Sequence, residues 1–328
     1  IQDLCIARRE GGMFSTLIDQ FWSLTLSGIA LGFIYVLISL GYTMVYGVLR
    51  MINFANSEIF MFGTFATIII SRDFLGNVDG TKSLPLPKLI LTISLCLIGS
   101  MIVSGLVAIF VELVAYRRLR ARGTNKLATL ISAIGISIVL SEFMRIITNS
   151  RPTLNPRVLE KKSLFEIAGA SFRIDTVLTI IFAAVLFFVL DRFVKYSRLG
   201  RAIRAVSMNE DAAKLMGVDL NKVISATFLI GGMMSGAAAY FYTMTYENTK
   251  FNVGFTLGLA AFTAAVIGGI GNIRGAFFGG LSLGLVEVYA SSILGTEWKS
   301  VTVFVILVLV LVLKPNGIFG EAVQQTRA

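Results

Sequence analysis

The sequence predicts an all-α polytopic membrane protein with about eight to ten transmembrane helices. Of its 328 residues, 55% are hydrophobic and 15% are charged, whereas a soluble protein carries about a quarter charged residues. Mean hydropathy is +0.81. Apolar runs near the length of a membrane crossing recur along the chain, and basic residues gather between them, as in chains that cross a bilayer repeatedly.

The apolar runs define the expected spans in chain order. The first is too long for one straight crossing and contains four glycines, so we expect a kink or two pieces; the last is short. The runs are 17–49, 51–71, 89–116, 127–148, 176–195, 223–246, 255–274, 276–294 and 299–314. Together they predict a single transmembrane domain over residues 17–320.

Short tails flank this domain, at residues 1–16 and 321–328. Residues 1–12 lack the apolar stretch of a signal peptide. We expect the natural start to be Met13 and the preceding residues to have no function.

The charged loops orient the domain. Residues 116–126 contain five basic residues and no acid, and 196–222 is also rich in Lys and Arg, so both are expected on the cytoplasmic side. The loop at 149–175 then lies outside, the C-terminus inside and Met13 outside. The similarity of "YTMVYG" (42–47) to "YTMTYE" (242–247), each at the end of a long apolar run, suggests an inverted repeat.

Several kinds of chemistry are excluded by composition. The chain has no His, so it has no His metal site, proton relay or His-based catalytic site. Its two cysteines make no metal-ligand spacing. No P-loop is present for ATP. We therefore expect no enzyme activity, no catalytic residue and no metal in this chain.

Polar residues interrupt an apolar run at 41–65. Asn53, Asn56, Ser57 and Glu58 follow Arg50, and polar groups at membrane depth usually face the protein interior. One interpretation is a discontinuous helix that lines a path for a substrate. The other is a short cytoplasmic turn followed by a helix that Ser57 caps.

The run 260–288 is rich in glycine and is expected to form a hairpin or re-entrant loop. Glu112, Glu142 and Glu287 lie near the ends of apolar runs and are expected to be interfacial or structural charges. Glu142 and Arg145 have the spacing of a local ion pair.

The segment 201–223 carries too many charges for a simple turn between spans. Helix-forming residues extend from Arg201 to Met216, Gly217 can stop the helix, and Asp219 can cap the next one. We expect one short amphipathic helix on the cytoplasmic surface. It is either a solvated loop helix or a surface on which a separate ATPase subunit acts.

Several motifs together resemble one family. "EDAAKLMGVDLNKVI" resembles the EAA loop of ABC importer permeases, and "GYTMVYGVLRMINFANSE", "YSRLGRAIRA", "AFTAAVIGGIGNIRGAFFGGLSLGLVE" and "LKPNGIFG" look like the LivH-type permeases of branched-chain amino acid importers. The resemblance implies a permease subunit of an ATP-driven importer in the bacterial inner membrane. It implies four kinds of partner: a LivM-type second permease, two ABC ATPases that hold ATP and Mg²⁺, an extracytoplasmic binding protein, and membrane lipid, with no nucleic acid.

The resemblance also implies roles for particular residues. Those expected along the substrate path are Tyr46, Asn53, Asn56, Glu58, Thr263 and Asn272. Those expected to couple the permease to the ATPases are Arg204, Glu210, Ala212, Ala213 and Gly217.

One departure leaves the substrate open. Family members commonly have "NFAHGE" where this chain has "NFANSE", so Asn56 replaces His and Ser57 replaces Gly. Neutral or branched-chain amino acids fit the family best, and urea, amides or acidic amino acids are alternatives. An ion-coupled secondary carrier and a passive amide or urea channel are the competing mechanisms.

Overall fold

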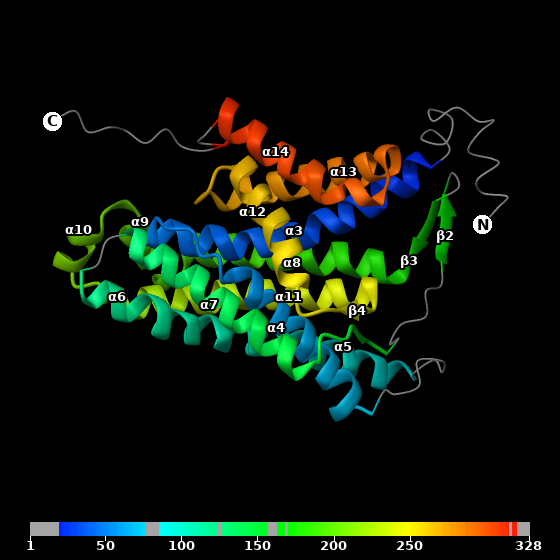
Figure 1. The fold of residues 1–328 in the computed structure, drawn as a ribbon, viewed down its shortest axis with the longest axis horizontal. Coiled ribbons are helices and arrows are strands. Elements are labelled where there is room, and N and C mark those ends of the chain that lie inside the picture. The colour runs from blue at the N-terminus through cyan, green and yellow to red at the C-terminus, as the bar shows by residue number, and fades with distance from the viewer. Residues whose placement is uncertain are drawn as a thin grey trace.

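The computed structural model describes residues 20–76, 85–123, 126–156, 163–167, 170–314 and 317–319. It is an elongated helical bundle whose long helices lie roughly along one axis (Figure 1). The first half contains α3 (Phe21–Leu49), α4 (Asn56–Ile69), the π-helical turn η1 (Ile70–Phe74), α5 (Leu86–Val111), a second π-helical turn η2 (Glu112–Arg117), α6 (Arg118–Ala121) and α7 (Lys126–Ile147).

The second half begins after a region of short strands, β1 (Thr153–Leu154), β2 (Ser163–Ile167) and β3 (Ala170–Arg173). It contains α8 (Ile174–Tyr196), α9 (Arg198–Met208), α10 (Glu210–Leu215), α11 (Leu220–Tyr246), β4 (Asn248–Thr249), α12 (Val253–Gly268), α13 (Ile273–Leu294), the 3₁₀ turn η3 (Thr296–Trp298) and α14 (Lys299–Leu313).

Among the described residues, seven helices are long and apolar enough to cross a membrane. They correspond to α3, α5 with its extension through α6, α7, α8, α11, α13, and α14 with η3. The expected runs 51–71 and 255–274 contain the shorter helices α4 and α12. The first run, expected to kink or divide, is the single 29-residue helix α3.

Two antiparallel helices form the centre of the bundle. The middle of α3 faces the middle of α11 where Gly41 approaches Gly231, and both helices are largely buried. Outside this pair, α13 packs on α3 and α5 packs on α11. A Cβ on Gly284 of α13 would lie 2.4 Å from Cα of Gly32, so only glycine permits this approach.

The two halves repeat one pattern in opposite orientations. α3 and α11 end on left-handed residues, Arg50 (φ 50°) and Glu247 (φ 58°). A short buried helix begins six residues after each of them, α4 at Asn56 and α12 at Val253. The "YTM" sequences both lie near the ends of α3 and α11, but Tyr42 is eight residues before Arg50 and Tyr242 is five before Glu247, so they are out of register with this pattern. This arrangement supports the inverted repeat.

The basic segments gather at one end of the bundle. Arg50 donates to the carbonyl of Ser207 at the end of α9 (2.9 Å), and Arg120 donates to Asn221 at the start of α11 (2.8 Å). The strands lie at the other end, where β1 pairs with β4 and β2 with β3 (Figure 1). Of the expected external loop 149–175, residues 157–162 and 168–169 lie outside the described residues. The segments expected on the cytoplasmic side thus share one end of the bundle, and the strands of the expected external loop lie at the other; the sidedness itself stays a prediction.

Candidate functional site

A break between α3 and α4 forms the centre of the candidate site. Arg50 ends α3, residues 51–55 are irregular, and α4 begins at Asn56. Asn53 holds this break in place, because its Oδ1 accepts from the N–H of Ala55 (3.1 Å) and from the hydroxyl of Tyr116 (3.0 Å). Because Asn56 lies beside Ile38, 18 residues back on α3, the chain reverses here and the break is a turn between two antiparallel helices. This matches the turn of the second interpretation, but without its cap, since Ser57 Oγ donates to the carbonyl of Phe54 (2.7 Å).

Asn56 links the two central helices. Its Nδ2 donates to the carbonyl of Ile38 on α3 (3.3 Å), and its Oδ1 accepts from the hydroxyl of Ser235 on α11 (3.2 Å). It lies against Gly41, where a Cβ would come within 2.9 Å of Oδ1. Because both ends of the amide have partners, Asn56 joins α3, α4 and α11 at one point.

Glu58 is a carboxylate in the first turn of α4 that is only 2% exposed. Its Oε1 accepts weak hydrogen bonds from Ser137 of α7 (3.4 Å) and from Ser57 (3.5 Å). Within the described residues, its Oε2 and the Nδ2 of Asn53 have no partner. Buried charges are normally paired, and the start of a helix gives a carboxylate partial compensation. The site thus offers one acceptor and one donor that are unused.

Helix α12 closes this site with an aromatic wall. Phe262 packs against Tyr42 of α3 and Phe54 of the break, with ring centroids 5.9 and 6.1 Å apart. Its neighbour Thr263 is buried and donates to the carbonyl of Leu259 within its own helix (2.9 Å). The second half therefore contributes mainly apolar surface.

The other two expected path residues lie elsewhere. Tyr46 is half-buried near the glycine turn between α12 and α13, where a Cβ on Gly271 would be 3.7 Å from its ring. Asn272 caps α13 by accepting from the N–H groups of Arg274 and Gly275, and its Nδ2 donates to Phe319 (3.0 Å). The structure thus brings together Asn53, Asn56 and Glu58, leaves Thr263 bonded within α12, and places Asn272 in a helix cap. The glycine-rich run is a helical hairpin, as expected.

The acids near the span ends are held in ion pairs. Glu112 is fully buried and lies 3.2 Å from both Arg117 and Arg120. Arg145 Nε donates to Glu142 (2.6 Å), which confirms the local pair. Glu287 accepts from the hydroxyl of Tyr35 (2.7 Å) and lies 3.8 Å from Lys299. In contrast to Glu58, each has a cationic partner.

The charged segment 201–223 contains two helices, so the expected single helix from Arg201 to Met216 is wrong. Asn209 breaks it with an extended backbone, and its side chain accepts from the N–H groups of Asp211 and Ala212 (3.0 Å each), which starts α10. Gly217 (φ 83°) ends α10 as expected.

Asp219 then caps α11 by accepting from the N–H of Lys222 (3.2 Å). This backbone hydrogen bond lowers the pKa of the Asp219 carboxyl. The expected stop and cap at this end of the segment are both confirmed.

The tip of this segment is apolar and exposed. Met208, Leu215 and Met216 are 81%, 89% and 84% exposed. The expected coupling residues Glu210, Ala212 and Gly217 are also exposed, whereas Ala213 is buried against the segment itself. Exposed large apolar groups that cluster mark interaction surfaces.

Arginines connect this tip to the membrane helices. Arg204 donates to the carbonyl of Lys195 at the end of α8 (3.1 Å). Arg50 donates to the carbonyls of Ser207 (2.9 Å) and Met208 (3.2 Å). Since Arg50 also begins the break that holds Asn53 and Glu58, α9 contacts the element that positions the candidate site.

Comparison with known proteins identifies the family. Residues 24–311 match the family described as branched-chain amino acid transport system / permease component. The chain belongs to this permease family.

It is 38% identical over 298 residues to the high-affinity branched-chain amino acid transport system permease protein BraD of Pseudomonas aeruginosa, covering 90% of this chain and 94% of that protein. It is 37% identical over 301 residues to the LivH permease of the corresponding Escherichia coli system, with the same coverage. The ribose import permease RbsC of Haemophilus influenzae is 23% identical over 198 residues, 58% of this chain and 61% of that protein. No solved structure matches the chain.

The permease is thus a multi-pass membrane protein of the bacterial ABC importer type and serves transport, not catalysis. Membership in this transport system implies further subunits. Sequence reasoning missed Tyr42, which lies in the same stretch as Asn53, and it missed Tyr116, Ser137 and Phe262, which reach the site from distant segments.

Proposed function

We propose that this permease forms one half of the path of an ATP-driven importer of neutral, chiefly branched-chain, amino acids. Its partners are a LivM-type second permease, two ATPase subunits that hold ATP and Mg²⁺, and an extracytoplasmic binding protein. The carrying observation is the start of α4, where the buried, unpartnered atoms of Glu58 and Asn53 lie within three residues of Asn56, which bonds to both central helices.

The chemistry of the break favours a zwitterion. A free amino acid brings an ammonium, which the Glu58 carboxylate can accept from, and a carboxylate, which the Asn53 amide and the start of α4 can donate to. An acidic side chain would add a second negative charge near Glu58. The aromatic wall of Tyr42, Phe54 and Phe262 suits an apolar side chain. Neutral amino acids therefore fit better than acidic ones.

Transport requires that this site open in turn to each side of the membrane. We propose that the motion caused by ATP hydrolysis enters the permease at the exposed tip of α10, which an ATPase subunit would contact through Leu215 and Met216. Motion of α9 would then reach Arg50 through the Ser207 and Met208 carbonyls and shift the break. The permease itself forms and breaks no covalent bond.

The test is uptake by the complete importer in proteoliposomes, with labelled leucine, alanine, glutamine, aspartate, lysine and urea. We expect saturable uptake of neutral amino acids that requires ATP. Glu58→Gln should reduce leucine uptake at least tenfold, since it removes the charge that receives the ammonium. Glu142→Gln, which changes an exposed acid already paired with Arg145, is the matched control.

The outcomes separate the alternatives. ATP-dependent uptake of urea or aspartate alone would change the assigned substrate but would still support an ATP-driven importer. Uptake that persists without ATP would favour a channel, and uptake by this chain without ATPase subunits would favour an ion-coupled carrier. Equal leucine uptake by the Glu58→Gln and Glu142→Gln variants would contradict the assigned role of Glu58.

A further inference from the structure

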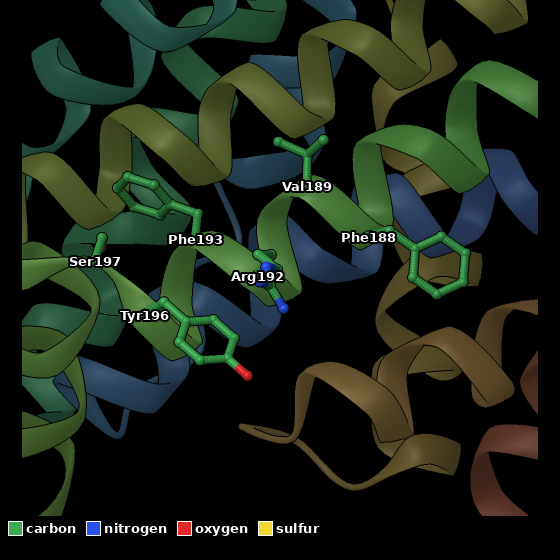
Figure 2. Close-up of a pocket in the computed structure, with 6 residues that line it drawn as sticks. All are labelled: Phe188, Val189, Arg192, Phe193, Tyr196 and Ser197. Carbon is green, nitrogen blue, oxygen red and sulfur yellow. The ribbon is translucent and has the colours of Figure 1, made fainter.

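A shallow hollow lies on the outer face of α8 near its cytoplasmic end. It has a volume of about 610 Å³ and is lined by Phe188, Val189, Arg192, Phe193, Tyr196 and Ser197. Figure 2 shows Phe188, Arg192 and Tyr196 pointing toward the same open side of the helix. Phe188 is 63% and Tyr196 55% exposed. Because α8 is long and apolar enough to cross the membrane, this face meets lipid unless another protein covers it.

Two cations contact the Tyr196 ring, Arg192 from the lining of the hollow and Lys195 from the position next to Tyr196. The guanidinium carbon of Arg192 lies 4.4 Å from the centre of the Tyr196 ring, and Nζ of Lys195 lies 5.4 Å from the same centre. Each contact is favourable alone. Both charges thus lie beside the same ring, where an anion can pair with either of them.

The neighbouring protein groups do not supply that anion. The nearby Asp191 forms an ion pair with Arg274 instead, with 3.7 Å between Asp191 Oδ1 and Arg274 Nε. Among the described residues, no carboxylate lies within ion-pair distance of Arg192, Lys195 or Arg198. Arg198 is the first residue of α9, so a third cation lies where α8 meets α9. This junction, with Arg192, Lys195 and Arg198, is called the basic corner below. The positive charge at this corner is uncompensated within the described chain.

The position of the corner indicates what the anion is. Tyr196 ends α8, and Ser197 caps α9 by accepting from the N–H of Gly200 (2.8 Å). This is the depth at which Tyr, Arg and Lys meet lipid headgroups. Apolar side chains extend from it toward the membrane centre. A basic corner joined to an apolar groove on the cytoplasmic side matches an anionic phospholipid.

We infer that the hollow on α8 binds one anionic phospholipid. Its phosphate lies between Arg192 and Lys195 beside the Tyr196 ring, and an acyl chain follows Val189 and Phe188. The site is separate from the transported substrate, so its test does not depend on the proposed function.

The test uses the complete importer, purified in detergent, with phosphatidylglycerol as the probe and phosphatidylcholine as the neutral reference. Native mass spectrometry measures the phospholipid retained per complex. The variant is Arg192→Gln with Lys195→Gln. The matched control is Arg118→Gln with Arg122→Gln, which removes the same charge from exposed positions beyond α5 at the same end.

We expect phosphatidylglycerol to bind wild type and the control with similar affinity. The Arg192/Lys195 variant should bind it about 30-fold more weakly, since each basic residue near the surface contributes a factor of about five. Phe188→Ala should weaken retention while it leaves every charge in place. Equal loss in both double variants would show diffuse surface attraction and overturn the inference, as would no loss in either.

A photo-reactive residue at Phe188 identifies the occupant directly. Labelling of phospholipid in the intact importer supports the lipid site. Labelling of the second permease instead would show that a protein covers this face, and would overturn the inference.

Discussion

The packing of α13 on α3 gives a sharp quantitative test. Gly284→Ala adds one methyl group that would lie 2.4 Å from the Cα and N of Gly32, where ordinary contact begins near 3.4 Å. The obstructing atoms are backbone, so the two helices must separate by about 1 Å. Overpacking of this kind costs about 1–3 kcal/mol, and the higher helix propensity of Ala returns up to about 1 kcal/mol. We expect a net loss of roughly 1–2 kcal/mol.

Gly47→Ala is the matched control, because Gly47 lies on α3, the helix on which Gly284 packs, and a Cβ there meets nothing within 4 Å. It should stabilise the protein by up to about 1 kcal/mol. Thermal unfolding of the purified complex in detergent, followed by Trp fluorescence, measures both. At roughly 2–4 °C per kcal/mol, Gly284→Ala should melt several degrees below Gly47→Ala. Equal melting temperatures would refute the close packing of these two helices.

Three further substitutions test the site and its connections. Asn56→Leu removes the hydrogen bonds to Ile38 and Ser235. At about 0.6 kcal/mol or more per interhelical bond, the free energy of unfolding should fall by about 1–2 kcal/mol in the same assay. A variant as stable as wild type would contradict the role of Asn56 in joining the helices. Arg50→Ala should leave the complex assembled but reduce uptake per ATP hydrolysed several-fold, and an unchanged ratio would exclude Arg50 from coupling. Leu215→Ser with Met216→Ser should reduce co-purification of ATPase subunits, while Lys222→Gln, an exposed polar change nearby, should not; equal recovery would show that the tip is not the docking surface.

The sequence predicted features that depend on local chemistry. The apolar runs located the membrane helices, Gly217 and Asp219 marked a real stop and cap, and Glu142 and Arg145 do pair. The break at Asn209 was missed, although Asn followed by two acids is a helix-start signal.

Other features depend on segments far apart in the chain. Tyr116 contacts Asn53, Ser137 contacts Glu58, and Phe262 packs on Tyr42. No periodicity in a single sequence specifies these partners. The same limit applies to Asn272, whose side chain is used in a cap and in a bond to Phe319 across 47 residues.

The exposed tip of α10 also bears on how the cell handles an orphan subunit. Met208, Leu215 and Met216 project from the end of the bundle that is expected to face the cytoplasm. Unfolded and unassembled chains are continuously examined by chaperones and proteases. Under the proposed function, assembly with an ATPase subunit conceals this surface, and an excess permease chain displays it to quality control. Subunit numbers can then be balanced after synthesis, by degradation of whatever remains uncovered.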